Sequence, residues 1–223
     1  MLTEDFFGRI AVISVFTFLA VCTVVPLFLY FQHDTSASTL AIVTQLASTV
    51  LLLLQLFMTI SRLPAQGTAK GIEPRVTSVV GTFLILVAMI LTRPVDNGSV
   101  QVAALCAILI GTTASSFCLY WLGRSFSIMA TARRLVTTGP YSIVRHPLYI
   151  CEAVLVAGMV ISHFSALMAA LGILQFSLQY RRARHEEATL RRTFPEYDEY
   201  ARRVPMLIPR FFPARRAATS QDS

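Results

Sequence analysis

The sequence predicts an all-α protein: a polytopic membrane bundle of about six transmembrane helices, with a C-terminal helical hairpin and a cytoplasmic amphipathic helix. The first observation is composition, because 55% of the 223 residues are hydrophobic, only 14% are charged, and the mean hydropathy is +0.63. A soluble domain carries roughly 25% charged residues. The second observation is that the apolar residues are gathered in long runs, which is typical of membrane-spanning helices.

The first four apolar runs are long enough to be candidate spans. Pro26 is expected to kink the first run. No A-x-A cleavage site follows that run and further spans do, so we expect a retained anchor rather than a signal peptide. The four candidate spans are residues 10–31, 39–60, 76–92 and 100–123.

The next apolar run, residues 148–180, is too long for one span. Its 33 residues would form a helix of about 50 Å, whereas a hydrocarbon core is roughly 30 Å thick. We expect the run to break at Ser162-His163-Phe164-Ser165 into two short helices joined by a tight turn. These two helices form the predicted hairpin.

Lys and Arg are distributed unevenly in this six-span topology. Eighteen of the 19 fall in segments that lie on one side, and only Arg93 lies on the other. Because cytoplasmic loops collect Lys and Arg, we expect an integral protein of a bacterial inner (cell) membrane with both termini in the cytoplasm. The alternative is a five-span protein with one re-entrant run, which would place Arg9 on the opposite side.

The chain divides into three parts: N-terminal transmembrane helices in 1–123, a core with the functional motifs in 124–212, and a disordered tail in 213–223. The net charge of +7 reflects topology, so we expect no nucleic-acid partner. All four cysteines lie in apolar runs without C-x-x-C spacing, so we expect neither a disulfide framework nor a metal site. The oligomeric state is left open.

A polar turn, LVTTGPYSIVRHPLYICEA in residues 135–153, separates two apolar regions. Pro147 is well placed as the first residue of a helix, with His146 at its cap. The free N–H groups of that helix start, with Arg145 beside them, are suited to a carboxylate or a phosphate, and Tyr141 and Tyr149 could supply aromatic walls. The alternative is that Arg145 and His146 face lipid headgroups, while the tyrosines form an interfacial belt.

The segment RRARHEEATL, residues 181–190, follows the last apolar run. On a helix Arg182 and Glu186 share one face, and the alternative reading is a solvated helix with intrahelical ion pairs. A hairpin returns its exit close to its entry. We therefore expect Arg182 and Glu186 to lie near His146 and Tyr149.

The segment FPEYDEYARRVPMLIP, residues 194–209, has Phe194, Tyr197 and Tyr200 at a spacing of three. This spacing predicts an amphipathic helix that either lies on the membrane or covers the site. Glu152, inside the hairpin, is a functional candidate because intramembrane carboxylates are costly, although it could also simply pair with an arginine.

The ordered set of LVTTGPYSIVRHPLY, a hairpin, EEATL and then FPEYDEYARRVP resembles the isoprenylcysteine carboxyl methyltransferase family and its relatives, the phospholipid N-methyltransferases. The resemblance covers residues 120–210. It implies an integral-membrane methyltransferase that uses S-adenosylmethionine at the cytoplasmic face. The sequence departs from the family pattern at Cys151 and Pro195, where glycine is common, which leaves the shape of the substrate site open.

The resemblance also implies roles for particular residues. Arg182 matches the arginine that holds the reacting end of the substrate, and Glu186 matches a residue of the acidic pair; we expect these two to be catalytic. The expected cofactor-binding residues are Leu135, Val136, Tyr141, Arg145, His146, Pro147, Leu148, Tyr149, Glu186 and Glu187.

The residues agree with such a reaction at the membrane face. No two of the ten glycines are two residues apart, so the glycine-rich turn of a Rossmann-type cofactor site is missing and helices must build the site. The leading expectation is O-methylation of an isoprenylcysteine-type carboxylate on a lipophilic substrate that enters from the bilayer among membrane lipids. The alternatives are N-methylation of a phospholipid headgroup and a membrane protein that binds a nucleotide-like ligand without turnover.

Overall fold

The computed structural model describes residues 2–33, 38–69, 71–127 and 131–209 of the chain. The tail predicted for 213–223 lies outside these residues. The long helices are α1 (Leu2–His33), α2 (Thr39–Ser61), α3 (Glu73–Leu91), α4 (Gly98–Leu122), α5 (Pro147–Ser162) and α6 (Ala166–Thr193). The predicted all-α membrane bundle is confirmed: the first four helices match the four predicted runs to within two residues at their C-terminal ends, and the run 148–180 is divided between α5 and α6.

Local sequence signals set where several of the helices begin. The side chains of Ser38, Asn97 and Ser165 accept hydrogen bonds from backbone N–H groups in the first turns of α2, α4 and α6. Pro147 is the first residue of α5, where its missing N–H costs nothing. The long apolar run therefore breaks where predicted, between Ser162 and Ser165.

Four helical stretches are long and apolar enough to cross a membrane: Val12–Leu29, Thr39–Ser61, Glu73–Leu91 and Gly98–Ser125. The helix α5 is apolar but shorter, with 16 residues or about 24 Å of helix. The helix α6 continues past its apolar half into the charged segment that begins at Arg181. Whether this hairpin crosses the whole bilayer stays a prediction.

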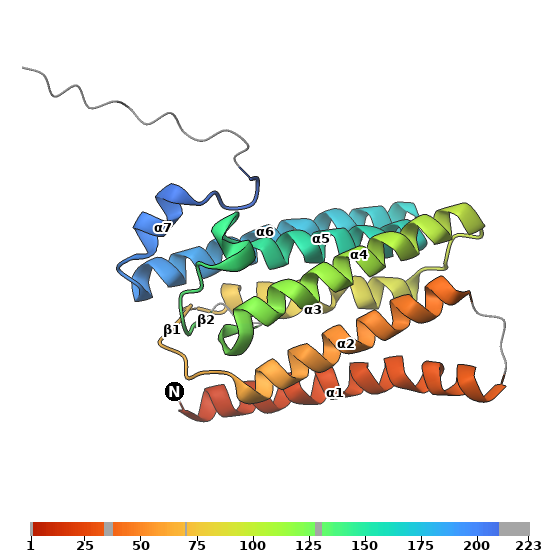
Figure 1. Cartoon of the computed structure of the whole chain (residues 1–223), viewed down its shortest axis with the longest axis horizontal. Helices are drawn as coiled ribbons and strands as arrows, with labels where there is room; N and C mark the ends of the chain where they lie inside the picture. Colours follow the sequence, from red (N-terminus) through yellow and green to blue (C-terminus); the bar gives the residue numbers. More distant parts are fainter. Residues whose placement is uncertain (1, 34–37, 70, 128–130, 210–223) are drawn as a thin grey trace, which may run out of the picture.

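The bundle brings the basic segments to one end. Figure 1 shows the N-terminal end of α1, the α2–α3 connection, the segment between α4 and α5, and α7 (Tyr197–Arg203) all at that end. Two short strands, β1 (Gly67–Thr68) and β2 (Thr131–Ala132), pair there in an antiparallel manner. This common end agrees with the predicted charge asymmetry, and its cytoplasmic location stays a prediction.

The segment 194–209 contains a helix as predicted, but it begins only at Tyr197 and ends at Arg203, directly before Val204-Pro205. The helix α6 continues to Thr193. The helical conformation stops before Pro195, and Tyr197–Arg203 forms the separate helix α7. Phe194, Tyr197 and Tyr200 are all buried, packed around Ala132. These aromatic side chains therefore cover the end of the bundle, and they are not membrane anchors.

The closest helix contact is between α4 and α5. Gly111 on α4 lies against Leu155, so that a side chain at position 111 would meet the Leu155 backbone. Ser115, one turn further along the same face, is fully buried. This small-residue stripe, which the spacing of Gly111 and Ser115 predicts, fixes α5 on α4 and hence the position of the polar turn before α5.

We expect Gly111→Ala to destabilise the protein by about 2 kcal/mol or more, because the new methyl group overpacks a backbone contact. Gly98→Ala is the matched control, since a methyl group there meets nothing within 4 Å. Thermal unfolding of both variants in one detergent is the measurement. Equal midpoints for the two variants would show that the α4–α5 contact is not tight.

Candidate active site

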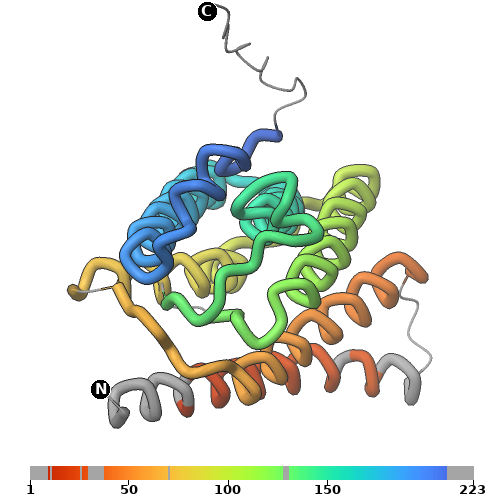
Figure 2. The backbone as a smooth tube through the Cα atoms, turned by 60° about the vertical axis from the view of Figure 1, so that its left-hand side comes forward, coloured from red at the N-terminus to blue at the C-terminus, as the bar shows by residue number. Residues whose placement is uncertain are grey.

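A pocket lies where the segment between α4 and α5 meets α6 and α7. The empty space inside it is about 790 Å³ when the open mouth is included. Figure 2 brings this end of the bundle forward and shows α7 beside the segment that precedes α5. The backbone N–H groups of Arg145 and His146 donate to the carbonyls of Pro205 and Met206, at 2.9 and 3.1 Å. The C-terminal segment is thereby tied to the start of α5.

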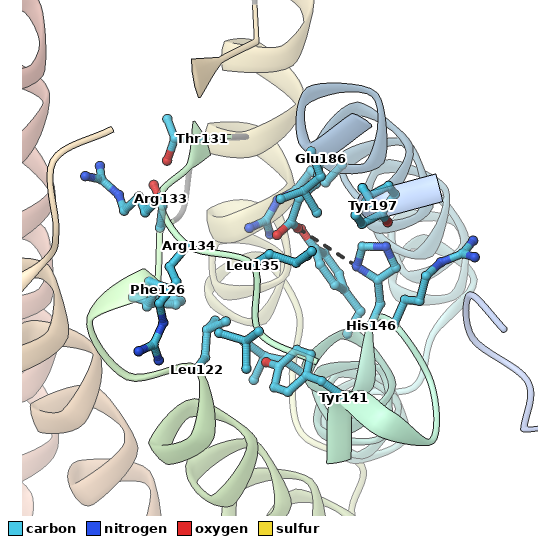
Figure 3. A pocket seen from close by; sticks show the side chains of 18 of the residues that line it. Leu122, Phe126, Thr131, Arg133, Arg134, Leu135, Tyr141, His146, Glu186 and Tyr197 are labelled. Atoms are coloured by element: carbon cyan, nitrogen blue, oxygen red, sulfur yellow. Dashed lines mark hydrogen bonds and ion pairs between the residues drawn. The ribbon is translucent and has the colours of Figure 1, made fainter. Parts of the chain in front are cut away.

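The start of α5 and the charged half of α6 meet in this pocket, as the hairpin predicts. The Tyr149 hydroxyl donates to Glu186 Oε2 over 3.1 Å, and His146 Nδ1 lies 4.0 Å from the same oxygen. The Arg182 guanidinium lies over the Tyr149 ring, 5.4 Å from its centroid. Figure 3 shows His146 and Glu186 facing each other with Tyr197 beside them.

Glu187 does not line the pocket, but it pairs with Arg145 and His146, which do. Its Oε1 accepts from Arg145 Nε at 2.8 Å, lies 2.7 Å from Arg145 Nη2, and lies 3.3 Å from His146 Nε2. Burial alone would raise the pKa of Glu187, but the hydrogen bond from His146 and the charge of Arg145 lower it to about 2. Glu187 is therefore ionised at neutral pH and pairs with Arg145.

The side-chain N–H groups of Arg145 donate hydrogen bonds to other groups of the protein. Besides Glu187, its Nη1 donates to the carbonyls of Ala201 and Val204, at 2.7 and 3.0 Å. The structure thus places Arg145 as a tie between α5, α6 and the end of α7. If Arg145 contributes to cofactor binding as predicted, it would do so by holding the neighbouring residues in position.

Nine of the predicted residues line the pocket: Leu135, Val136, Tyr141, Arg145, His146, Leu148, Tyr149, Arg182 and Glu186. Two do not. Pro147 is buried at the start of α5, and Glu187 is taken up by Arg145 and His146. The structure brings the nine together, and their roles stay predictions.

The pocket also has walls that the motifs do not single out. They come from the end of α4 and the segment after it, and from α6: Leu122, Ser125, Phe126, Ser127, Thr131, Arg133, Arg134 and Leu190. The Arg133-Arg134 pair was visible in the sequence, but its charge served only to predict orientation. Nothing in the spacing of these residues relates them to the His146 region.

Several buried hydroxyl groups in the pocket have no partner within the described residues. These are the hydroxyls of Tyr141, Tyr197, Ser125 and Ser127. Burial raises the pKa of both tyrosines above the usual value, so each keeps its proton and can donate a hydrogen bond. Buried polar groups are normally satisfied, so this set indicates that the pocket holds a ligand with acceptor atoms.

Glu152 lies in the pocket wall on the α5 side, closer to the bundle interior than Tyr149. Its Oε2 accepts from Gln179 Nε2 at 3.2 Å, so its hydrogen-bond partner is a neutral amide on α6. Arg182 lines the same pocket. The positive charge of Arg182 also acts on this carboxylate, so both interpretations from the sequence, a functional carboxylate and a partner of an arginine, stay predictions.

The fold and the pocket define a class of protein: an integral-membrane helical bundle with a polar ligand site at one end. The comparisons with known proteins then specify the family. Residues 99–197 match the family model described as phospholipid methyltransferase. This match spans α4, the polar turn, the hairpin and the residues up to α7, which is the part of the chain that builds the pocket.

Two relatives are similar to the chain. The nickel-cobalt-cadmium resistance protein NccN of Alcaligenes xylosoxydans xylosoxydans is 34% identical over 161 residues, which cover 69% of this chain and 75% of the relative. The cobalt-zinc-cadmium resistance protein CzcN of Cupriavidus metallidurans is 44% identical over 77 residues, which cover 34% of this chain and 36% of the relative.

The chain belongs to the phospholipid methyltransferase family, whose members resemble the isoprenylcysteine carboxyl methyltransferases. The family predicted from the motifs is confirmed. The protein is therefore a membrane methyltransferase.

We expect Glu187→Gln to destabilise the protein at neutral pH by about 2 kcal/mol or more, because Arg145 loses its buried counter-charge. The pKa of Glu187 is lowered from 4.5 to about 2, so its contribution is complete above pH 4.5 and is lost as the pH falls toward 2. The unfolding midpoint of the wild-type protein should therefore drop over this range more steeply than that of the variant.

Glu199→Gln is the control, since Glu199 is exposed and forms an exposed ion pair with Arg203 on the same helix. Its midpoint should follow the wild-type curve from pH 7 to pH 2. A Glu187→Gln curve that also follows the wild type would contradict the buried ion pair.

Proposed function

We propose that the protein transfers a methyl group from S-adenosylmethionine to a lipophilic acceptor that reaches the pocket from the bilayer. The leading acceptor group is a carboxylate, as in isoprenylcysteine O-methylation. The observation that carries the proposal is the meeting of His146, Tyr149 and Glu186 in a pocket where the hydroxyls of Tyr141 and Tyr197 have no partner within the described residues.

The residues present fit S-adenosylmethionine. Glu186, about one third exposed, offers a carboxylate to an ammonium or to ribose hydroxyls. The hydroxyls of Tyr141 and Tyr197 offer donors to a carboxylate or to ring nitrogens. Leu135, Val136 and their apolar neighbours in the pocket supply a wall for adenine.

When bound, the cofactor supplies a methyl group on an activated sulfonium, so the protein must mainly align the acceptor and exclude water. Arg182 is placed to orient an anionic acceptor group, because it is buried, lines the pocket and is held over the Tyr149 ring. A carboxylate acceptor attacks without losing a proton. Arg182 alone would then be enough to position it.

The family description gives a reason to keep a second acceptor, the amine of a phospholipid headgroup. An amine must lose a proton before it attacks, and Glu152 and Glu186 both lie in the pocket wall. Glu152 accepts a hydrogen bond from Gln179, and Glu186 accepts one from Tyr149. This arrangement would serve an amine acceptor, whereas Arg182 would serve a carboxylate, which stays the leading acceptor.

The names of the two relatives connect them with resistance to metals. We infer that this chain contributes to a similar trait, and that it does so through methyl transfer at this pocket. Metal tolerance conferred by the expressed protein should then be lost in Glu186→Ala.

Calorimetric titration of S-adenosylhomocysteine into the purified protein tests the cofactor assignment. We expect His146→Ala and Glu186→Ala to weaken binding about tenfold or more, because each removes a polar contact of a charged ligand. Arg182→Ala should bind normally but turn over slowly with labelled S-adenosylmethionine. If all three variants bind like the wild type, the residue assignment is wrong.

A panel of acceptors tests the substrate class. Prenylcysteine, fatty acid, thiol and phosphatidylethanolamine are each incubated with the protein and labelled S-adenosylmethionine. Glu152→Gln keeps the shape of the residue and removes its charge, so it should slow N-methylation at least tenfold and leave O-methylation of a carboxylate intact or faster. An equal loss with every acceptor would mean that Glu152 is only structural.

A further inference from the structure

The pocket has a second group of side chains that the proposed cofactor contacts do not use. Figure 3 shows Leu135 between the two groups, with His146, Glu186 and Tyr197 on one side of it. The other side is built by the end of α4 and the segment after it: Leu122, Phe126, Thr131, Arg133 and Arg134. Ser125 and Ser127, next to Phe126 in the chain, line the pocket as well. We call Ser125, Ser127, Arg133 and Arg134 the arginine subsite.

The arginine subsite carries positive charge and no carboxylate. The sequence has no acidic residue between Asp96 and Glu152, so the acidic residues that line the pocket, Glu152 and Glu186, belong to α5 and α6. Arg133 is buried, with only 2% of its surface exposed, and donates through Nη1 to the carbonyl of Leu63. Arg134 is exposed. The subsite is therefore suited to an anion.

The buried hydroxyls give a second, independent indication of a ligand. Ser125 is 92% buried, since its exposed fraction is 8%, and its Oγ has no hydrogen-bond partner within the described residues. The Oγ atom of Ser127 is also buried and has no hydrogen-bond partner within the described residues. An oxyanion in this part of the pocket would be an acceptor for these two hydroxyls and would lie in the positive field of the arginines.

The wall beside the arginine subsite is apolar. Leu122 and Phe126 line the pocket, and Phe126 packs in a core cluster with Leu119 and Leu148. The subsite also lies at the end of α4, which is one of the helices long and apolar enough to cross a membrane. A ligand here can place its anionic head on the arginines and its apolar part against the helices.

We propose that the arginine subsite binds the anionic headgroup, a phosphate or a carboxylate, of the amphiphilic acceptor. This anionic group is separate from the group that is methylated, so an acceptor of this class carries both. Only the identification of this ligand as the methyl acceptor rests on the proposed function. Binding of an anionic amphiphile to the subsite can be measured without methyl transfer.

Fluorescence of Trp121 tests this binding without an activity assay. Trp121 is the single tryptophan of the chain and stands one residue before Leu122, which lines the pocket. Its ring packs against Gly139. The protein in phosphatidylcholine nanodiscs is titrated with oleoyl lysophosphatidic acid, oleate, uncharged mono-oleoylglycerol and inorganic phosphate. We expect saturable changes with the first two probes and none with the uncharged lipid. Inorganic phosphate should bind at least tenfold more weakly than lysophosphatidic acid, because it has no apolar part.

Two variants address the subsite itself. Arg134→Gln should weaken lysophosphatidic acid binding about tenfold, since one charge-assisted contact is lost. Ser125→Ala should weaken it about fivefold without lowering the unfolding midpoint, because the Ser125 hydroxyl has no partner within the described residues to lose. Arg181→Gln is the control for charge, since Arg181 is exposed on α6 and does not line the pocket.

The proposal is overturned if mono-oleoylglycerol and lysophosphatidic acid titrate alike, if inorganic phosphate binds as tightly as the lipid, or if Arg134→Gln behaves like Arg181→Gln. A parallel titration with S-adenosylhomocysteine separates this inference from the proposed function. Binding of the lipid without the cofactor product would contradict the proposed function alone, and the reverse would contradict the subsite alone.

Discussion

The site depends on the buried pairing of Glu187 with Arg145 and His146. Glu187 is on α6, and its two partners stand immediately before α5. Arg145 extends the connection to the carbonyls of Ala201 and Val204, and the neighbouring backbone bonds to Pro205 and Met206. One ionised carboxylate thus fixes three segments that are distant in sequence. Without this pairing, the segments that form the walls of the pocket would lose a contact that holds them in one arrangement.

The fold was predictable from the sequence because the bilayer leaves few choices. Long apolar runs must be helices, and a run too long for one span must break, as it does between Ser162 and Ser165. The approach of Glu186 to His146 and Tyr149 followed from the same hairpin. Helix periodicity and chain reversal therefore determined the core of the site.

Other features could not be read from the sequence, for identifiable reasons. The predicted helix of 194–209 is shortened because Pro195 separates α6 from α7, and its aromatic face is buried against Ala132. Spacing marks a helix as amphipathic but does not say whether protein or lipid covers the apolar face. Arg133 and Arg134 follow β2, whose pairing with β1 joins residues 63 and 65 positions apart, a contact for which the sequence holds no local signal.

The chemistry of the pocket follows from its position at the end of a bundle. Figure 3 shows Glu186 of α6 on one side of Leu135, and Arg133 and Arg134 from the segment after α4 on the other. A charged, water-soluble cofactor and an oily acceptor can both be satisfied only where such groups meet. The loop between α4 and α5 supplies most of these groups, which explains why so polar a segment stands between two apolar helices.

Ultraviolet crosslinking of methyl-labelled S-adenosylmethionine, followed by peptide mapping, tests the central claim most directly. The label should appear in peptides that contain residues 135–149 and 182–197, and excess S-adenosylhomocysteine should abolish it. Label confined to α1, α2 or α3, or label that S-adenosylhomocysteine does not compete away, would contradict a cofactor site between α5 and α6.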